Sequence, residues 1–313
     1  MAKRMAFGWK TPEFPTDGSD NATMIRQTTT TLDLIADRFD AAWVTDHVLP
    51  WARWQPATSP VIECWTTLTF LAARYPGLSW GTIVLCQSYR NPALLAKMVA
   101  QLCAFIPDKV IFGIGAGWKE DEYRAYGWEF PRPAIRIRQL EETVEIVKRL
   151  WTADDVTYEG QHYRAQNAFL NPKPDPLPPI MIGGGGEQLT LRVVAKHADW
   201  WNGGGTREVY AHKVDVLRGH CAAIGRDADT IVKSWQCECV AIAPTQEGAE
   251  QLAAASPFYT GPEASLVGTP EQVIAQIEAW AALGVGHMQI RFADFPRTDG
   301  IRLFMDEVLP HFA

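Results

Sequence analysis

The sequence contains no long hydrophobic run and no long block of basic residues. No uninterrupted apolar stretch approaches the roughly 20 residues of a membrane-spanning helix, and none of signal-peptide length follows the basic Met-Ala-Lys-Arg start. The formal net charge of −7 argues against nucleic acid or an anionic membrane surface as the main partner. We therefore expect a cytoplasmic protein with no nucleic-acid or membrane partner, in which any anionic ligand is held locally.

Cysteine is sparse for a chain of 313 residues. Its six cysteines are too scattered for the disulfide framework of a small secreted protein, so we expect reduced, packed thiols. The seven histidines form no H-E-x-x-H motif, and Cys237-x-Cys239 has the wrong spacing for a zinc knuckle. We therefore expect no metal site.

The signature motifs of several enzyme classes are also missing. The chain has neither G-x-x-x-x-G-K-[ST] nor G-x-S-x-G, which disfavours nucleotide hydrolysis and serine-hydrolase chemistry. The segment Gly113-Ile114-Gly115-Ala116-Gly117 departs from the dinucleotide fingerprint, because Trp118 occupies the position of the third glycine. This departure disfavours a Rossmann domain.

The sequence does show a regular alternation of strand and helix patterns. Hydrophobic residues make up 47% of the chain and charged residues 21%, which is typical of a globular enzyme. Eight short apolar segments, each followed by a helical pattern, predict a single α/β domain over residues 1–313, a (β/α)8 TIM barrel, with an open doubly wound sheet as the alternative. The expected strands cover residues 5–10, 41–45, 78–85, 110–114, 180–182, 199–202, 232–243 and 287–292.

Two stretches interrupt this alternation and are interpreted as insertions. The first, at about 152–179, is rich in proline, and Glu159-Gly160 predicts a hairpin within it; we expect this insertion to cover part of the barrel mouth. The second, at about 244–268, is small and polar. The pattern Thr269-Pro270-Glu271-Gln272 after it predicts a capping box at the start of a helix.

Chemistry in a parallel barrel takes place on the loops that follow the strands. The second strand ends in Trp43-Val44-Thr45-Asp46-His47, with Trp51 and Trp54 close behind. An isolated Asp-His pair is more often a turn cap with a satisfied imidazole. Its position at a strand end favours a functional pair, with His47 and Asp46 as the candidate catalytic residues.

The fifth strand runs directly into Gly183-Gly184-Gly185-Gly186 and then into a helix. Exposed backbone N–H groups and a helix N-terminus are the usual physical means of holding phosphate. One glycine would suffice for a tight turn, so four in succession favour an approaching ligand. The run predicts a phosphate site.

Several of these segments together resemble the luciferase-like monooxygenase superfamily: Trp43-Val44-Thr45-Asp46-His47, Gly81-Thr82-Ile83-Val84, Tyr89-Arg90-Asn91-Pro92, Gly113-Ile114-Gly115-Ala116-Gly117-Trp118 and Ile182-Gly183-Gly184-Gly185-Gly186. Within that superfamily, Asp46-His47 and Gly115-Ala116-Gly117-Trp118 are most similar to the branch that uses the deazaflavin coenzyme F420. The resemblance implies a homodimer. It also implies a non-prolyl cis peptide near Ile83-Val84.

The resemblance further implies that a planar cofactor lies across the barrel mouth with its phosphate at Gly183–Gly186. Asp46, Thr82, Ile83 and Val84 would then contact the ring, and Ala116 and Gly117 the ribityl chain and phosphate. Trp118 stands where the sugar-phosphate dehydrogenases of this branch carry an acidic residue, which makes glucose 6-phosphate a doubtful substrate.

The resulting hypothesis is hydride transfer between C5 of coenzyme F420 and a small organic substrate. His47 would donate or accept the proton, and Trp51 and Trp118 would shape the substrate pocket. One alternative is a two-component monooxygenase that receives reduced FMN from a separate reductase. The other is a cofactor-binding protein without turnover.

Overall fold

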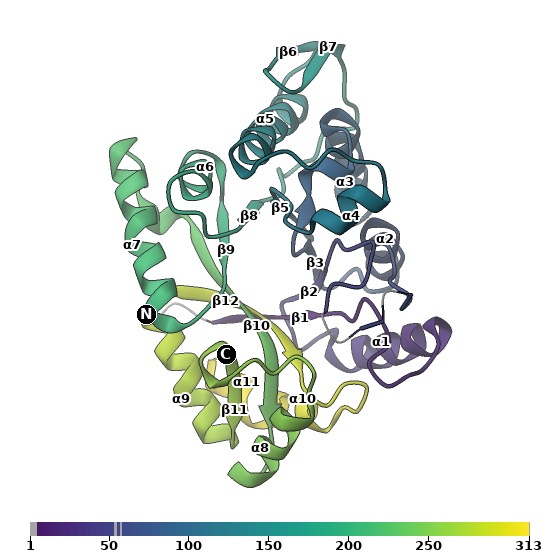
Figure 1. The fold of residues 1–313 in the computed structure, drawn as a ribbon, viewed down its shortest axis with the longest axis vertical. Helices are drawn as coiled ribbons and strands as arrows, with labels where there is room; N and C mark the ends of the chain where they lie inside the picture. Colours follow the sequence, from purple (N-terminus) through teal and green to yellow (C-terminus); the bar gives the residue numbers. More distant parts are fainter. Residues whose placement is uncertain (1–4, 53–54, 57, 313) are drawn as a thin grey trace.

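Eight parallel strands close into a barrel in the computed structural model, which describes residues 5–52, 55–56 and 58–312. Each barrel strand pairs in parallel with the next, and the last pairs back with the first through Ala6 and His287. Figure 1 shows the helices around the outside of these strands. The predicted (β/α)8 barrel is thereby confirmed over an open sheet. The barrel strands are β1 Ala6–Lys10, β2 Ala41–Val44, β3 Ser79–Thr82, β5 Val110–Gly115, β8 Ile180–Gly183, β9 Trp200–Gly203, β10 Val232–Ile242 and β12 Val285–Phe292.

The helices begin where the sequence places its capping residues. Asn91 accepts from the N–H groups of Ala93 and Leu94, with Pro92 at the first helical position. Thr269 and Gln272 form the predicted capping box. The helices are α1 Asn21–Ile35, α2 Cys64–Arg74, α3 Pro92–Phe105, α4 Glu120–Ala125, α5 Pro133–Thr152, α6 Thr190–His197, α7 Arg207–Ala223, α8 Gln246–Ala255, α9 Pro270–Ala281, α10 Asp299–Leu303 and α11 Leu309–Phe312.

Within the part of the chain that the structure describes, no helix is long and apolar enough to cross a membrane. All six cysteines are free and buried, as expected from their scattered apolar positions.

A single tryptophan fills much of the barrel interior and explains two glycines on the neighbouring strands. The Trp43 ring is fully buried between β1 and β3. A Cβ atom on Gly8 would lie 2.1 Å from Trp43 Nε1, and one on Gly81 would lie 2.2 Å from Trp43 Cζ3. Trp43 Nε1 donates to His287 Nε2 at 3.1 Å, which links β2 to β12 across the interior.

The third barrel strand is interrupted by a bulge after Thr82. The Ile83–Val84 peptide is cis, as the family resemblance implies, and it separates β3 from β4 (Leu85–Cys86), which pairs with β5. Close packing accounts for Gly113 on β5, since a Cβ there would lie 1.8 Å from the Thr82 carbonyl oxygen.

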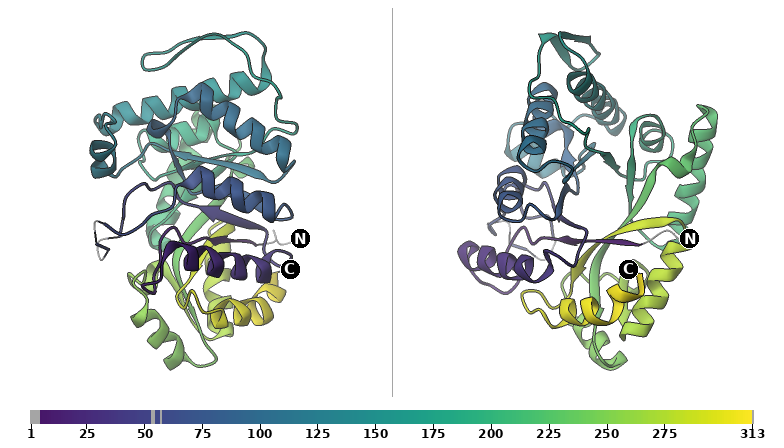
Figure 2. Two further views of the ribbon diagram at one scale, coloured as in Figure 1. Left: turned by 90° about the vertical axis from the view of Figure 1, so that its right-hand side faces the viewer. Right: turned by 180° about the vertical axis from the view of Figure 1, so that it is seen from behind.

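The first insertion forms the predicted hairpin, made of β6 (Val156–Glu159) and β7 (Arg164–Ala168). It packs against α5: Tyr158 Oη donates to Glu145 Oε2 at 2.9 Å, and the N–H groups of Gln161, His162 and Tyr163 donate to Glu142. Figures 1 and 2 show it beyond α5, at the end of the molecule. None of its described residues lines the central cavity, so the expectation that it covers the mouth was wrong.

The second insertion is more ordered than its small, polar composition suggests. It contains α8 and the strand β11 (Ser265–Gly268), which extends the sheet by pairing with the second half of β10 from Cys239 to Ile242. The extra strand is possible because β10 is 11 residues long and continues past the barrel rim.

Candidate active site

A cavity of about 440 Å³ opens at the carboxyl ends of the barrel strands. Loops after β2, the β3–β4 bulge, β5 and β8 all contribute to its wall, as expected for a parallel barrel. Ten residues singled out from the sequence line it together: Asp46, His47, Trp51, Ile83, Val84, Ala116, Gly117, Trp118, Gly183 and Gly184. Trp54 lies outside the described residues.

His47 is held by a carboxylate that the sequence analysis missed. Its Nδ1 atom lies 3.1 Å from both Oε1 and Oε2 of Glu122, on α4. Because a carboxylate only accepts hydrogen bonds, the proton is on Nδ1, and Nε2 is then the lone-pair nitrogen of the neutral ring. His47 thus has the orientation that a general base or acid requires.

The Glu122 carboxylate is itself held by several hydrogen bonds. Its carboxylate accepts from the backbone N–H groups of Val48 (2.8 Å) and Leu49 (3.0 Å) and from Tyr89 Oη (2.9 Å). Burial acts to raise the pKa of this carboxyl, but the hydrogen bonds from His47 and the backbone outweigh it, so the pKa lies below its ordinary value. Glu122 is therefore ionised at neutral pH.

Aromatic rings surround His47 on two sides. Its imidazole stacks on Trp51, with centroids 5.8 Å apart and an interplanar angle of 30°, and meets the edge of Trp118 at 5.7 Å. Trp118 is 64% exposed, so it forms an outer wall of the cavity. The predicted pocket residues Trp51 and Trp118 are thus adjacent to the predicted catalytic histidine.

Asp46 has no free oxygen for acid–base work. Arg90 donates Nη1 to Oδ2 at 2.8 Å and Nη2 to Oδ1 at 3.0 Å, and the Cys86 N–H donates to Oδ2 at 2.8 Å. Such a bidentate pair fixes both side chains. The contacts favour a positioning role, in which Asp46 ties the end of β2 to the segment that follows the bulge.

The glycine run after β8 divides into two parts. Gly183 and Gly184 line the cavity, while Gly185 and Gly186 continue toward α6 and α7. A Cβ on Gly185 would lie 2.3 Å from the ammonium nitrogen of Lys213, on α7. Across the described ranges, the N–H groups of Gly185 and Gly186 have no acceptor and Lys213 has no carboxylate partner. With the nearby Thr190 hydroxyl, these groups form a site suited to phosphate.

Thr82 occupies a different place from its neighbours in the sequence. Its hydroxyl donates to the Gly113 carbonyl at 2.7 Å and accepts from the Gly113 N–H at 3.2 Å, and it does not line the cavity. Its contact with a cofactor stays a prediction. Thr45, by contrast, lines the cavity, and its buried hydroxyl has no partner in the described part of the chain. A polar ligand atom would satisfy it.

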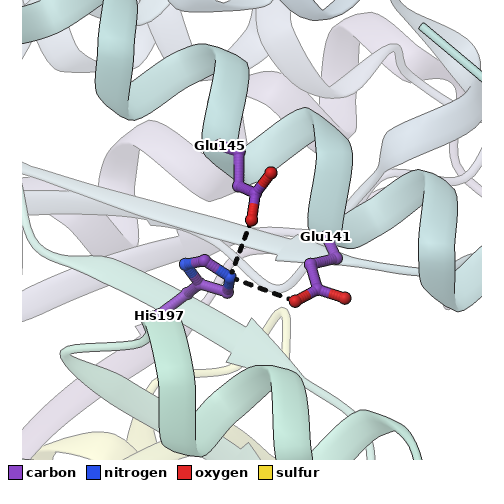
Figure 3. Close-up of side chains that lie close together, drawn as sticks. All are labelled: Glu141, Glu145 and His197. Carbon is purple, nitrogen blue, oxygen red and sulfur yellow. Dashed lines mark hydrogen bonds and ion pairs between the residues drawn. The ribbon is translucent and has the colours of Figure 1, made fainter. Parts of the chain in front are cut away.

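One cluster of potential metal ligands lies away from this cavity. Glu141, Glu145 and His197 converge between α5 and α6 (Figure 3), with His197 Nε2 lying 3.4 Å from Glu141 Oε1. The Lys196 ammonium already pairs with Glu141 at 2.7 Å and with Glu145 at 3.1 Å. We interpret the cluster as an ion-pair network that joins the two helices.

The residues that sequence reasoning missed are Glu122, Arg90 as the partner of Asp46, and Lys213. Glu122 lies 75 positions beyond His47, in a charged segment that resembles any solvated helix. Lys213 belongs to an amphipathic helix with no local motif. These side chains are identified only by their contacts in the fold: Glu122 with His47, Arg90 with Asp46, and Lys213 with Gly185.

Known proteins share both sequence and fold with this chain. An F420-dependent glucose-6-phosphate dehydrogenase from Mycolicibacterium smegmatis is 33% identical over 201 residues, which cover 61% of this chain and only 57% of that protein. The protein of the same name from Microbacterium testaceum is 26% identical over 302 residues, covering 87% of this chain and 88% of that protein.

Among solved structures, an F420-dependent secondary alcohol dehydrogenase in complex with an F420–acetone adduct superposes with a TM-score of 0.83. It covers 99% of both chains at 19% identity, so it shows a shared fold. A sequence model described as luciferase-like monooxygenase matches residues 5–263. The chain therefore belongs to the luciferase-like monooxygenase family.

Proposed function

We propose that this protein is an F420-dependent oxidoreductase that transfers a hydride between C5 of the deazaflavin and a small organic substrate. The observation that carries the proposal is one cavity whose two ends present different functional groups. One end presents His47, oriented by Glu122 at 3.1 Å. The other reaches Gly183, Gly184 and Thr190, and Lys213 lies just beyond them, beside Gly185. The names of the two relatives support the choice of coenzyme F420.

The residues present fit a planar cofactor that bears a phosphate. The N–H groups of Gly185 and Gly186, the Thr190 hydroxyl and the Lys213 ammonium would hold the phosphate. Ile83 and Val84 line the cavity and would support the ring. The Thr45 hydroxyl, which has no partner among the described residues, offers the ring a hydrogen bond. When bound, the deazaflavin supplies a carbon that accepts or donates a hydride.

His47 would manage the proton that accompanies the hydride. When an alcohol is oxidised, its carbon loses a hydride and its hydroxyl loses a proton; Nε2 of His47 accepts that proton while Nδ1–H stays bonded to Glu122. In the reverse direction the imidazolium returns the proton to the carbonyl oxygen. Trp51 and Trp118 hold the imidazole ring in place through their aromatic contacts.

Titration of the purified protein with both cofactors tests this proposal. We expect coenzyme F420 to bind and to be reduced by an alcohol, or its reduced form to be consumed by a carbonyl compound. Tight FMN binding with no response to coenzyme F420 would overturn it. That result would favour a monooxygenase that receives reduced FMN from a separate reductase, which the family description makes the second candidate. Retained cofactor with no substrate turnover across a broad panel would favour a binding protein.

We further propose a cytoplasmic homodimer. The six free, buried thiols are compatible with a reducing compartment. An apolar groove between α2 and α3, lined by Trp65, Met98 and Phe105, supports dimer formation, and Phe105 is 64% exposed in the single chain. Contiguous exposed apolar surface of this kind is typical of an interface.

A further inference from the structure

Two cations stand at the side of the barrel opposite the glycine run. Lys10 ends β1 and Arg291 lies on β12, whereas the glycine run follows β8, four strands around the ring from β1. Both side chains are buried, with Lys10 at 1% exposure and Arg291 at 5%. Charges in this position would decide whether an anionic substrate can be bound.

Each of these cations is already neutralised by a carboxylate. Lys10 Nζ lies 2.5 Å from Glu238 Oε1, and Arg291 Nη2 lies 3.1 Å from Glu13 Oε2. Burial raises the pKa of Glu238, but Lys10 and Arg291 outweigh that effect and lower it to about 2, so Glu238 is ionised at neutral pH. Both cations therefore have a carboxylate partner, and Arg291 Nε also lies 3.9 Å from Glu238 Oε2.

Arg291 is also closed off from the main cavity. Its guanidinium lies 4.1 Å from the centroid of the Phe258 ring and 5.7 Å from that of Trp51, and Trp51 Nε1 donates to Glu13 Oε1 at 2.6 Å. Arg291 is not among the residues that line the main cavity, while Lys10 and its partner Glu238 are. An anion arriving there would meet Glu238 together with Lys10, and repulsion would offset the attraction.

The other cations that line the cavity are either paired with a carboxylate or lie on another side of the cavity. Lys119 pairs with Asp121. Arg136 donates to the carbonyl oxygens of Gly117 and Pro131. Gly117 follows β5, which is the neighbour of β8 in the barrel. Among the described residues that line this cavity, Arg136 is the cation without a carboxylate partner, and its bond to Gly117 places it beside a residue assigned to the cofactor. Lys213 lies outside the lining, next to Gly185.

We infer that the substrate is an uncharged alcohol or carbonyl compound that carries no phosphate or carboxylate group. The end of the cavity where His47 lies offers the half-buried Glu238 carboxylate and aromatic faces at Trp51 and Trp118. Among the residues that the structure describes, that end has no cation without a carboxylate partner. This inference rests on the proposed hydride transfer and narrows it to a substrate class that excludes sugar phosphates.

Matched substrate pairs test the inference on the complex with coenzyme F420. The pairs are glucose with glucose 6-phosphate, and isopropanol with lactate, in which a carboxylate replaces one methyl group. We expect kcat/KM for the uncharged member of any pair that reacts to be at least about tenfold higher, a difference of about 1.4 kcal/mol. A preference for glucose 6-phosphate or lactate overturns the inference.

A Glu238→Gln variant gives an independent readout. Removing this carboxylate leaves Lys10 partly uncompensated, so we expect inhibition by inorganic phosphate, competitive with substrate, to strengthen by about tenfold. Glu145→Gln, in the ion-pair network between α5 and α6 and away from this cavity, is the matched control and should leave phosphate inhibition unchanged. Unchanged inhibition in a folded Glu238→Gln protein contradicts the role given to Glu238. If that variant does not fold, the comparison of substrate pairs on the wild-type protein still decides.

A separate measurement distinguishes this inference from the proposed function. Cofactor binding is titrated first, without substrate, and a failure to bind coenzyme F420 counts against the proposed function alone. Glucose 6-phosphate and glucose are then titrated into the protein with whichever cofactor it binds. Binding of the phosphate ester to the Lys10 side, lost in Lys10→Met, would overturn the inference whatever the cofactor is.

Discussion

His47 Nδ1 is equidistant, at 3.1 Å, from the two carboxylate oxygens of Glu122, although 75 residues separate them in the chain. The carboxylate also caps the backbone N–H groups of Val48 and Leu49, so it fixes the loop that carries the histidine as well as the ring. One side chain thereby sets both the position and the tautomer of the proposed acid–base group.

Replacement of His47 by alanine removes the proposed proton acceptor. We expect kcat to fall by about 10² to 10⁴, the usual contribution of a positioned acid–base group. Cofactor affinity should stay within about twofold, because the phosphate site lies at the other end of the cavity. Steady-state kinetics and cofactor titration on the same preparation check both expectations, and unchanged turnover would remove His47 from the mechanism.

Glu122→Gln tests the orienting role separately. A glutamine amide must present N–H donors toward groups that are themselves donors, so some of the bonds from His47, Val48 and Leu49 are lost. We expect kcat to fall by at least about tenfold while the His47 side chain remains. Glu120→Gln, exposed on the same helix, is the control. A purely structural role for Glu122 would lower thermal stability and leave kcat of the folded fraction intact.

The barrel could be predicted from the sequence because its signals are local and repeated. The fourth unit is an example: β5 and α5 follow from an apolar run and a helical pattern, and neither needs a distant partner to be recognised. The expected cover over the mouth was wrong for the opposite reason. Where the hairpin of residues 156–168 packs depends on Glu142 and Glu145, and its own sequence says nothing about them.

The site could be predicted in part. Strand-end residues such as Asp46 and His47 are placed by the rules of a parallel barrel, and the structure puts both at the cavity. The sequence could not show that Arg90 occupies both oxygens of Asp46, since that depends on the exact course of the chain after the Ile83–Val84 bulge. From the sequence, Gly183 was expected to serve ligand binding alone. A Cβ at that position would lie 2.9 Å from a Val84 methyl carbon, so close packing also accounts for the glycine.

The ammonium of Lys213 gives a test of the phosphate site. We expect Lys213→Met to weaken cofactor binding by about tenfold, because the site loses its charged donor and keeps its backbone N–H groups. The affinity of the variant should also depend less on salt concentration. Arg218→Met, on the same helix, is the control because Arg218 pairs with Asp215 at 3.0 Å on the surface. Equal affinities for wild type and Lys213→Met would place the phosphate elsewhere.

The groove between α2 and α3 gives a test of the proposed dimer. A charge at Phe105 would be buried without a partner in a dimer formed through this face, so we expect Phe105→Glu to be monomeric. Phe169, in the first insertion, is exposed to the same 64% and provides the matched control, Phe169→Glu. Sedimentation velocity at several concentrations measures the outcome. A wild-type monomer, or a Phe105→Glu dimer, contradicts the proposed interface.

The buried histidine of the barrel interior has a measurable effect on acid stability. Burial lowers the pKa of His287 to about 3, so the ring stays neutral in the folded protein and accepts a hydrogen bond from Trp43 Nε1. The unfolded chain binds a proton near pH 6.5, so stability from this group is present above pH 6.5 and is lost as the pH falls toward 3.

By pH 5 the loss amounts to about 2 kcal/mol, which is 1.36 kcal/mol per pH unit over about 1.5 units. His287→Gln keeps an acceptor for Trp43 but cannot titrate, so its free energy of unfolding should fall less than that of wild type between pH 7.5 and pH 5. Denaturant unfolding at both pH values measures the difference, and His162→Gln, at an exposed position of the hairpin, controls for the loss of any histidine. Parallel pH dependences for wild type and His287→Gln would mean that the imidazole takes up a proton inside the barrel, and the interior around Trp43 would then have to admit water.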